Sequence, residues 1–299
     1  MKEPRKGEGG RPNNLLRVAL LASLVAGCAS TSYQYRWDFF VQDILRPDAL
    51  IIQGVLLTVY IAVISQTMGV ILGVFGAIAK MARSPLFRIP GELYIWVFRG
   101  TPLLVQIMLI YFGLGVTGIY GFPDFAPLAA FGTGAVQAGI IALGVNEGAY
   151  MSEIVRAGIL SIDPGQGEAA KSLGMTYGQM MRRIILPQAA RVIVPPLGNE
   201  FNNMLKTTSL LVLVGTRELF VTFSNKNGSG PQSFHPFELF LAAAVWYLLL
   251  TSIWGVIQGR IERRLGRGFG GEAPPGLRER ILTGWRRAPA EPVAVTGGR

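Results

Sequence analysis

Long apolar stretches constrain this chain more than any other feature of its sequence. A helix needs about 20 mostly apolar residues to cross the hydrocarbon core of a bilayer. Half of the chain is hydrophobic and 15% is charged, whereas soluble domains carry about 25% charged residues. The sequence therefore predicts an all-α, polytopic membrane protein with a five-helix core and an extra N-terminal helix. The candidate spans are Leu50–Ala79, Leu93–Leu114, Ala135–Ile154, Val192–Val214, Pro236–Ile257 and, first in the chain, the short Val18–Ser30.

The basic residues are distributed unevenly between the segments that separate these spans. Lys and Arg concentrate in residues 1–17, after the first core span, between residues 156 and 191, and from Arg260 to the C-terminus. Because positive charge marks the cytoplasmic side of a membrane, we expect both termini in the cytoplasm when the first segment is retained. The net charge of +10 then reflects topology. Nucleic-acid binding is not expected, since no basic element is interleaved with aromatic residues.

The two ends of the chain lie outside the expected core, which runs over residues 50–260. We expect a basic cytoplasmic N-terminus at 1–17, a short hydrophobic segment with an external linker at 18–49, and a basic disordered tail at 261–299. Val25-Ala26-Gly27-Cys28 resembles a bacterial lipoprotein cleavage site. Cleavage would leave Cys28 lipid-anchored outside the cell, whereas retention of Val18–Cys28 would add a helix, and the sequence leaves both open.

Residues 161–191 are too polar to span a membrane, but they carry clear helix start and stop signals. Asp163-Pro164 supplies a good N-cap followed by a residue suited to the first helical position. Gly174 suits a left-handed stop. Thr176-Tyr177-Gly178-Gln179 matches a capping box that starts a second helix, which Pro187 is expected to end or kink. The segment predicts two short helices that meet at a turn on the cytoplasmic face.

The same segment carries a recognisable motif. Glu168-Ala169-Ala170, then Gly174 and, after nine residues, Ile184-x-Leu186-Pro187 match the EAA loop of ABC-importer permease subunits. The resemblance covers about residues 50–260. Four further stretches narrow it to the polar amino-acid subfamily of these permeases: Phe98–Gln106, Ala149–Arg156, Gly165–Glu168 and Leu205–Leu210. At Thr207 this chain departs from the subfamily, many members of which have Asp there.

This resemblance implies a permease subunit of an ABC importer in the bacterial plasma membrane, carrying polar amino acids such as glutamate, glutamine or arginine. In that family the EAA loop, here about residues 161–187, supplies a coupling helix that docks into a cytoplasmic ATPase. The alternative for this segment is a solvated amphipathic loop without a partner. The resemblance implies as partners an ATPase dimer, a second permease subunit, an external solute-binding protein and membrane lipid. It implies the coupling role for Glu168, Ala169, Ala170 and Gly174.

Nothing in the sequence indicates that this chain is itself an enzyme. It has no Gly-rich phosphate loop ending in Gly-Lys-Ser/Thr and no Gly-x-Ser-x-Gly elbow. His235 is the one His and Cys28 the one Cys, so a His- or Cys-based metal site is not expected. We therefore expect no cofactor in this chain, with ATP and magnesium bound by the partner ATPase. A membrane-embedded enzyme is disfavoured because no catalytic cluster is evident.

Polar side chains within the expected spans are candidates for a substrate path, since burying such groups in a membrane is costly. Two of them lie near the middle of the span Ala135–Ile154, and the others lie in the span that follows. The candidates are Asn146, Glu147, Asn199, Glu200, Asn203, Lys206 and Thr207.

Helical spacing places the candidates in the span Val192–Val214 on two neighbouring faces of the helix. Asn199, Asn203 and Lys206 recur at i, i+4 and i+7, which predicts that they share one face, with Glu200 and Thr207 on an adjacent stripe. On such a path, amide and carboxylate groups would meet the ammonium group of an amino acid, and Lys206 its carboxylate. The alternative is internal glue, in which a membrane carboxylate pairs with Lys206 or amides bond between helices.

Three further charged residues have structural interpretations from the sequence. Arg99 is expected about seven residues from the cytoplasmic end of its span, where it would snorkel to the interface. Glu153 and Arg156 are spaced i, i+3, which favours an ion pair on one helix rather than a substrate site.

The main rival function is a secondary amino acid transporter, driven by an ion gradient through Glu147 and Glu200. Such a protein would need inverted internal repeats with paired broken helices. No convincing repeat relates the halves of this chain, and the EAA motif would then be unexplained.

Overall fold

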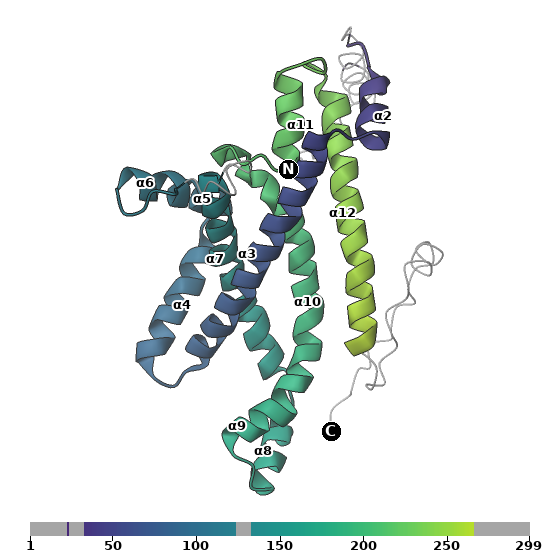
Figure 1. The fold of residues 1–299 in the computed structure, drawn as a ribbon. Helices are drawn as coiled ribbons and strands as arrows, with labels where there is room; N and C mark the ends of the chain where they lie inside the picture. The colour runs from purple at the N-terminus through teal and green to yellow at the C-terminus, as the bar shows by residue number, and fades with distance from the viewer. Residues whose placement is uncertain (1–22, 24–32, 124–132, 266–299) are drawn as a thin grey trace, which may run out of the picture. The chain divides into compact units, whose positions relative to one another are not determined.

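The computed structural model describes residue 23, residues 33–123 and residues 133–265, and these residues form helices and turns without a β-strand. The chain divides into two compact units, Met1–Trp37 and Asp38–Arg299. In the first unit the rings of Tyr33, Tyr35 and Trp37 pack in succession. The helices, most of them labelled in Figure 1, are α2 (Trp37–Leu45), α3 (Ala49–Met81), α4 (Pro85–Gly100), α5 (Leu103–Met108), η1 (Leu109–Gly113), α6 (Leu114–Val116), α7 (Thr133–Leu160), α8 (Pro164–Ser172), α9 (Tyr177–Met180), η3 (Met181–Ile185), α10 (Leu186–Thr207), η4 (Thr208–Val214), α11 (Leu219–Gly228) and α12 (Pro236–Leu265).

Several of the predicted segments lie outside the described residues. They are the basic N-terminus at 1–17, the segment Val18–Cys28 apart from Ser23, and the tail from residue 266. At the other boundary the structure differs from the expectation, because α12 continues to Leu265. Residues 261–265, expected in the disordered tail, are therefore helical.

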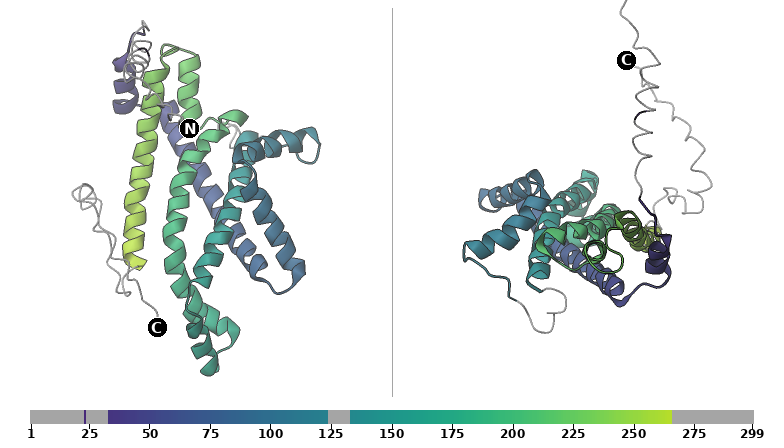
Figure 2. Two further views of the ribbon diagram at one scale, coloured as in Figure 1. Left: turned by 180° about the vertical axis from the view of Figure 1, so that it is seen from behind. Right: turned by 90° about the horizontal axis from the view of Figure 1, so that it is seen from above.

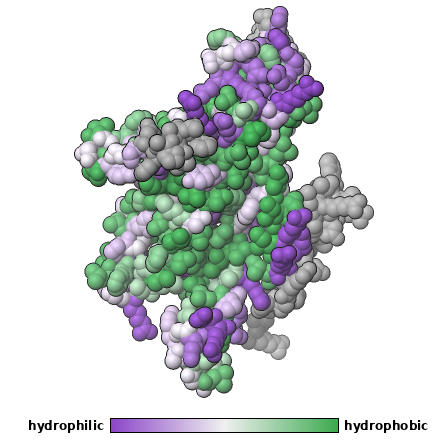
Figure 3. Space-filling view, in the orientation of Figure 1, coloured by the Kyte–Doolittle hydropathy of each residue, from purple (hydrophilic) through white to green (hydrophobic). Residues whose placement is uncertain are grey.

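Two of the expected spans, α3 and α12, are single helices that are long and apolar enough to cross a membrane. The span Ala135–Ile154 is also one helix, α7. Because α7 and α10 carry polar and charged residues, they have no long stretch as apolar as those of α3 and α12 and do not qualify as spans by composition alone. Figure 3 shows apolar side chains over the middle of this face of the molecule and hydrophilic side chains gathered at its ends. This distribution agrees with a multi-pass membrane protein.

The expected span Leu93–Leu114, which contains Arg99 and Pro102, is not one continuous helix. The helix begins at Pro85 and ends at Gly100, and the chain then turns by 107° into α5, η1 and α6, which project to one side in Figures 1 and 2. Pro102 has no N–H to donate and disfavours helical backbone at the residue before it, which favours an interruption of the helix here. The 16 residues of α4 extend about 24 Å before the bend.

The expected span Val192–Val214 is interrupted as well. The α-helix α10 ends at Thr207, the 3₁₀-helix η4 carries the chain to Val214, and Gly215 turns it at a φ of 76°. Pro187 does not end the second loop helix, because π-helical η3 joins α9 to α10 directly. A π turn already departs from the i→i−4 pattern, so the missing N–H of a proline is easily accommodated there.

Glycines allow α3 and α7 to approach closely. A Cβ atom at Gly69 would lie 2.5 Å from Glu147 Cγ, and one at Gly73 would overlap the Met151 side chain. From the other helix, a Cβ at Gly148 would lie 2.7 Å from Leu72 Cβ. Small residues at such crossings permit the tight packing that associates helices in a membrane. This packing fixes α7, with its polar residues, against α3.

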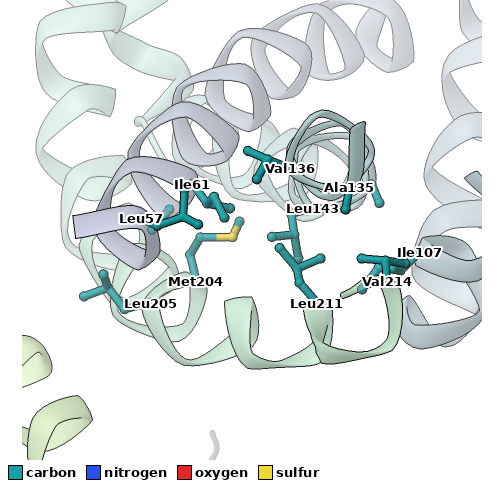
Figure 4. Close-up of a cluster of buried hydrophobic side chains, with 12 residues drawn as sticks. Leu57, Ile61, Ile107, Ala135, Val136, Leu143, Met204, Leu205, Leu211 and Val214 are labelled. Atoms are coloured by element: carbon teal, nitrogen blue, oxygen red, sulfur yellow. The ribbon is translucent and has the colours of Figure 1, made fainter. Parts of the chain in front are cut away.

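The largest hydrophobic cluster connects five elements, as Figure 4 shows. Leu57 and Ile61 from α3 meet Leu143 from α7, Met204 from α10 and Leu211 from η4, and Ile107 from α5 closes the cluster. All of these side chains are buried. The cluster holds the interrupted end of α10 against the α3–α7 pair.

A buried carboxylate that the sequence analysis did not single out anchors α11. Glu218 caps this helix by accepting a hydrogen bond from the Val221 N–H at 2.9 Å. The same carboxylate accepts hydrogen bonds from the hydroxyls of Tyr247 at 2.7 Å and Thr58 at 3.4 Å. It therefore joins α11 to α12 and α3 through groups far apart in the sequence.

Lys226 makes a second connection near the start of α3. Its ammonium lies 2.8 Å from Asp43 Oδ1 and 2.8 Å from Asp48 Oδ2. Asp48 also caps α3 by accepting a hydrogen bond from the Ile51 N–H at 2.9 Å. Partial burial raises the pKa of Asp48, but the bonds from Lys226 and Ile51 outweigh it and hold the pKa below its ordinary value.

Candidate functional site

The coupling loop, residues 161–187, begins and turns as the sequence predicts. Asp163 caps α8 by accepting a hydrogen bond from the Gly165 N–H at 2.7 Å. Gly174 has a φ of 75°, and its N–H donates to the Lys171 carbonyl at 2.9 Å. This left-handed residue satisfies carbonyls at the end of α8, as helix stops of this kind do. The predicted turn is confirmed.

The second helix of the coupling loop starts at the predicted capping box. The Thr176 N–H donates to Gln179 Oε1 at 2.9 Å, and Thr176 Oγ1 accepts from the Gln179 N–H at 3.4 Å. Ala170 is buried against Met180 and Ile185, and this cluster holds α8 against α9 and η3. Ala170, one of the four residues for which the resemblance implies the coupling role, therefore packs inside the loop and not on its surface.

The exposed surface of the coupling loop carries several charged side chains and, beside the turn, two large apolar ones. Glu168 and Ala169 are exposed, and Glu168 forms no ion pair among the described residues. Leu173 and Tyr177, which flank the turn at Gly174, are 81% and 73% exposed. The sequence analysis missed both, although their position beside the predicted turn could have identified them. The turn at Gly174 therefore has a large exposed apolar side chain on either side.

A second candidate site, the membrane pocket, has a volume of about 420 Å³ and lies between the bend after α4, the middle of α7 and the end of α10. Thr101 and Tyr150 also line it, and none of its lining residues is Lys or Arg. Five of the seven predicted path residues come together there: Asn146, Glu147, Glu200, Asn203 and Thr207.

The face predicted from Asn199, Asn203 and Lys206 is not the face of α10 that meets the membrane pocket. Lys206 does not line the pocket, and Asn199 accepts a hydrogen bond from Gln258 of α12 at 3.1 Å. Gln258 also donates to the Pro195 carbonyl at 3.3 Å, so contacts with α12 fix the rotation of α10. The stripe that lines the pocket has the spacing i, i+3 and i+7 and consists of Glu200, Asn203 and Thr207.

Side-chain amides satisfy the backbone groups freed at the bend after α4. Gln106 Nε2 donates to the carbonyls of Phe98 at 2.9 Å and Thr101 at 3.1 Å. Asn146 Nδ2 donates to the same Phe98 carbonyl at 3.0 Å and to Gln106 Oε1 at 2.9 Å. Non-helical backbone at membrane depth requires such partners. The Phe98–Gln106 stretch therefore encodes the bend that forms one wall of the pocket.

The side chains of Glu147 and Asn146 both form hydrogen bonds to other helices. Hydrogen bonds of amides between helices are one part of the alternative in which these groups hold the helices together. Gln66 Nε2 of α3 donates to Glu147 Oε1 at 3.1 Å. The other part of that alternative, a membrane carboxylate paired with Lys206, is not found: no ion pair among the described residues joins Lys206 to Glu147 or Glu200. The pocket acids therefore have no cationic partner in this part of the chain.

Arg99 differs from its predicted placement. It lies one residue before the end of α4, about 21 Å along the helix from Pro85, rather than near the end expected at the cytoplasm. Its guanidinium carbon lies over the Tyr150 ring, 5.2 Å from the ring centroid. The predicted ion pair of Glu153 and Arg156 is confirmed, with Oε2 and Nη2 2.8 Å apart, and Lys80 joins it from α3.

The described residues contain no group of three or more His, Cys, Asp or Glu side chains arranged to hold a metal ion. The two candidate sites are the coupling loop and the polar pocket.

Comparison with known proteins relates most of the chain to transport permeases. Residues 69–267 match the family described as "Binding-protein-dependent transport system inner membrane component". The arginine transport system permease protein ArgU of Corynebacterium glutamicum is 39% identical over 84% of this chain and 78% of its own length. The probable amino-acid permease protein YxeN of Bacillus subtilis is 36% identical over 78% of this chain and 97% of its own length.

A solved structure shares the fold. It is described as the crystal structure of an amino acid ABC transporter with histidines, and its matching chain is 35% identical. The TM-score is 0.66, over 78% of this chain and 100% of the other.

Proposed function

The chain belongs to the family of binding-protein-dependent transport system inner membrane components, and on that premise we propose how it works. It is the permease subunit of an amino acid ABC importer and a multi-pass protein of the inner membrane. We propose that it carries a polar amino acid through the membrane pocket and draws energy from ATP hydrolysis by a partner ATPase through the coupling loop. Both termini then lie in the cytoplasm, on the side of the coupling loop.

The observation that carries the coupling role is the exposed turn between α8 and α9. Its backbone is fixed at both helix ends by caps, and its surface combines Glu168 with Leu173 and Tyr177. A rigid projection of this kind transmits motion from a docked protein better than a loose loop would. Glu168 has no partner in the described ion pairs and is suited to a basic group on the ATPase.

The membrane pocket supports a preference among polar amino acids. Glu147 and Glu200 line it without a Lys or Arg residue, so it favours a substrate with positive charge at one end. The arginine transport role in the name of ArgU agrees with this preference. Amides of Asn146 and Asn203 would orient the solute by hydrogen bonds.

The remaining partners follow from the family. We propose a second permease subunit that completes the path, an external solute-binding protein that delivers the amino acid, and two ATPase subunits that bind ATP and magnesium. This chain itself then holds no nucleotide and catalyses no reaction.

The experiment that tests the function is uptake of labelled amino acids by the permease reconstituted with its ATPase and binding protein. We expect uptake to require ATP and to favour arginine and lysine over glutamate. Gly174→Arg should abolish uptake and ATPase association, because a residue with a Cβ strains the turn at a left-handed φ and the long Arg side chain adds bulk to the docking surface. Gly174→Asn, which tolerates that φ, should retain most uptake.

Two outcomes would contradict the proposal. Uptake that persists without ATP and follows an ion gradient would favour the secondary transporter. Normal ATPase association by Gly174→Arg would remove the coupling role from this turn.

A further inference from the structure

The lining of the membrane pocket has no cationic side chain that could bind the α-carboxylate of an amino acid. Its lining supplies two carboxylates, several neutral polar groups and no cation. An amino acid carries an α-carboxylate, which Glu147 and Glu200 would repel. The sequence assigned this carboxylate to Lys206, but Lys206 does not line the pocket. A cation from another position has to receive it.

Arg99, like Lys206, does not line the pocket, but its guanidinium carbon lies over a side chain that does. It stands two residues before Thr101, which forms part of the pocket wall, and 5.2 Å from the ring centroid of Tyr150, which lines the pocket. No carboxylate of the described ion pairs engages Arg99. A guanidinium that contacts an aromatic ring keeps several N–H donors, and these donors match a carboxylate in a two-bond arrangement.

We propose that Arg99 binds the α-carboxylate of the transported amino acid at the mouth of the membrane pocket, with Tyr150 holding the guanidinium in place. The cationic end of the solute then faces Glu147 and Glu200. This inference rests on the proposed function, since it takes the pocket as the substrate path. The two charges of the solute are separated along the pocket, so a solute without a carboxylate is bound less well.

The test compares two ligands that differ in the carboxylate. Binding of L-arginine and L-arginine amide is measured on the purified permease–ATPase complex without the external binding protein, which would otherwise impose its own selectivity. We expect the wild type to prefer arginine by about tenfold or more, as charge-assisted bonds of this kind warrant. Arg99→Gln should weaken arginine binding by about the same factor while leaving the amide within about twofold.

Matched variants separate the inference from its premise. Lys206→Gln should bind both ligands as the wild type does, and Arg99→Lys should keep part of the preference, because it retains charge without the planar fork. If Arg99→Gln does not assemble, Arg99→Lys decides, and an unchanged preference in it overturns the role of the fork.

The overturning results are distinct. If the preference survives in Arg99→Gln, or disappears in Lys206→Gln, the assignment to Arg99 is wrong and the pocket still stands. If the wild type binds neither ligand, or if Glu147→Gln and Glu200→Gln leave arginine binding unchanged, the pocket itself is not the substrate path and the inference falls with it.

Discussion

In the coupling loop each helix end is closed by residues within a few positions of one another, whereas each wall of the membrane pocket comes from a different helix. The bond from Thr176 to Gln179 spans three positions. The bond from Gln66 to Glu147 spans 81, and the bond from Asn146 to Phe98 spans 48. The loop is a local structure, and the pocket exists only when three helices are assembled.

This difference determines how each region responds to change. A substitution in the coupling loop alters one cap or one turn and leaves the helix packing intact. A substitution in the pocket walls also removes contacts that hold α3, α4 and α7 together. The loop can therefore tune coupling independently of the fold, while pocket residues serve substrate binding and assembly at once.

The largest expected effect comes from separating α3 and α7. Gly73→Leu would place a side chain where Met151 lies, and we expect it to lower stability by at least about 3 kcal/mol or to prevent folding. Gly255→Leu on α12 is the matched control, because nothing lies within 4 Å of a Cβ there. Thermal midpoints of the detergent-solubilised complexes measure the difference. Equal midpoints for the two variants would show that the close α3–α7 crossing is not required.

A smaller loss is expected from the bend alone. Gln106→Leu removes the bond to the Thr101 carbonyl and one of the two bonds of the Asn146 amide, which keeps its bond to the Phe98 carbonyl. The loss should cost about 2–3 kcal/mol. Arginine binding should fall, while association with the ATPase persists, because the coupling loop is untouched. Gln137→Leu, which loses one exposed bond to the Pro123 carbonyl, should cost under about 1 kcal/mol. Loss of ATPase association in Gln106→Leu would contradict the independence of the two regions.

What the sequence could predict follows the same division. The cap at Asp163, the turn at Gly174 and the capping box at Thr176 depend on neighbouring residues, and all three are confirmed. The inward position of Ala170 was missed because it depends on packing against Met180.

The membrane pocket was predicted only in composition. Hydropathy identified the polar residues, but the stripe of α10 that faces inward is set by contacts with α12, which spacing within one helix does not reveal. The bend at Thr101-Pro102 is written in the sequence as a proline, and yet its 107° angle depends on Gln106 and Asn146 capping the freed carbonyls. Arg99 was misplaced because the start of its helix was predicted eight residues late.

A local effect is expected in the coupling loop. Thr176→Ala removes the side-chain half of the capping box and should destabilise α9 by about 1 kcal/mol. Thr176→Ser keeps the hydroxyl and is the control. We expect weaker ATPase association with an unchanged thermal midpoint of the membrane domain, measured by pull-down and by unfolding of the solubilised permease. A lowered midpoint would show that the loop also supports the helix packing.

The smallest expected effect lies at Asp48, where a local cap and a distant ion pair meet in one carboxylate. Because its pKa is lowered in the folded protein, its stabilising contribution is complete above the ordinary Asp pKa of about 3.9 and is lost as the pH falls through the lower folded value. Asp48→Asn keeps a good N-cap and removes the charge that meets Lys226. The thermal midpoint of the wild type should therefore fall more than that of Asp48→Asn between pH 6 and about pH 3.5. If the thermal midpoints of the two proteins fall in parallel with pH, the bond to Ile51, not the charge of Lys226, accounts for the role of Asp48. The start of α3 would then depend on neighbouring residues alone, as the helix starts of the coupling loop do.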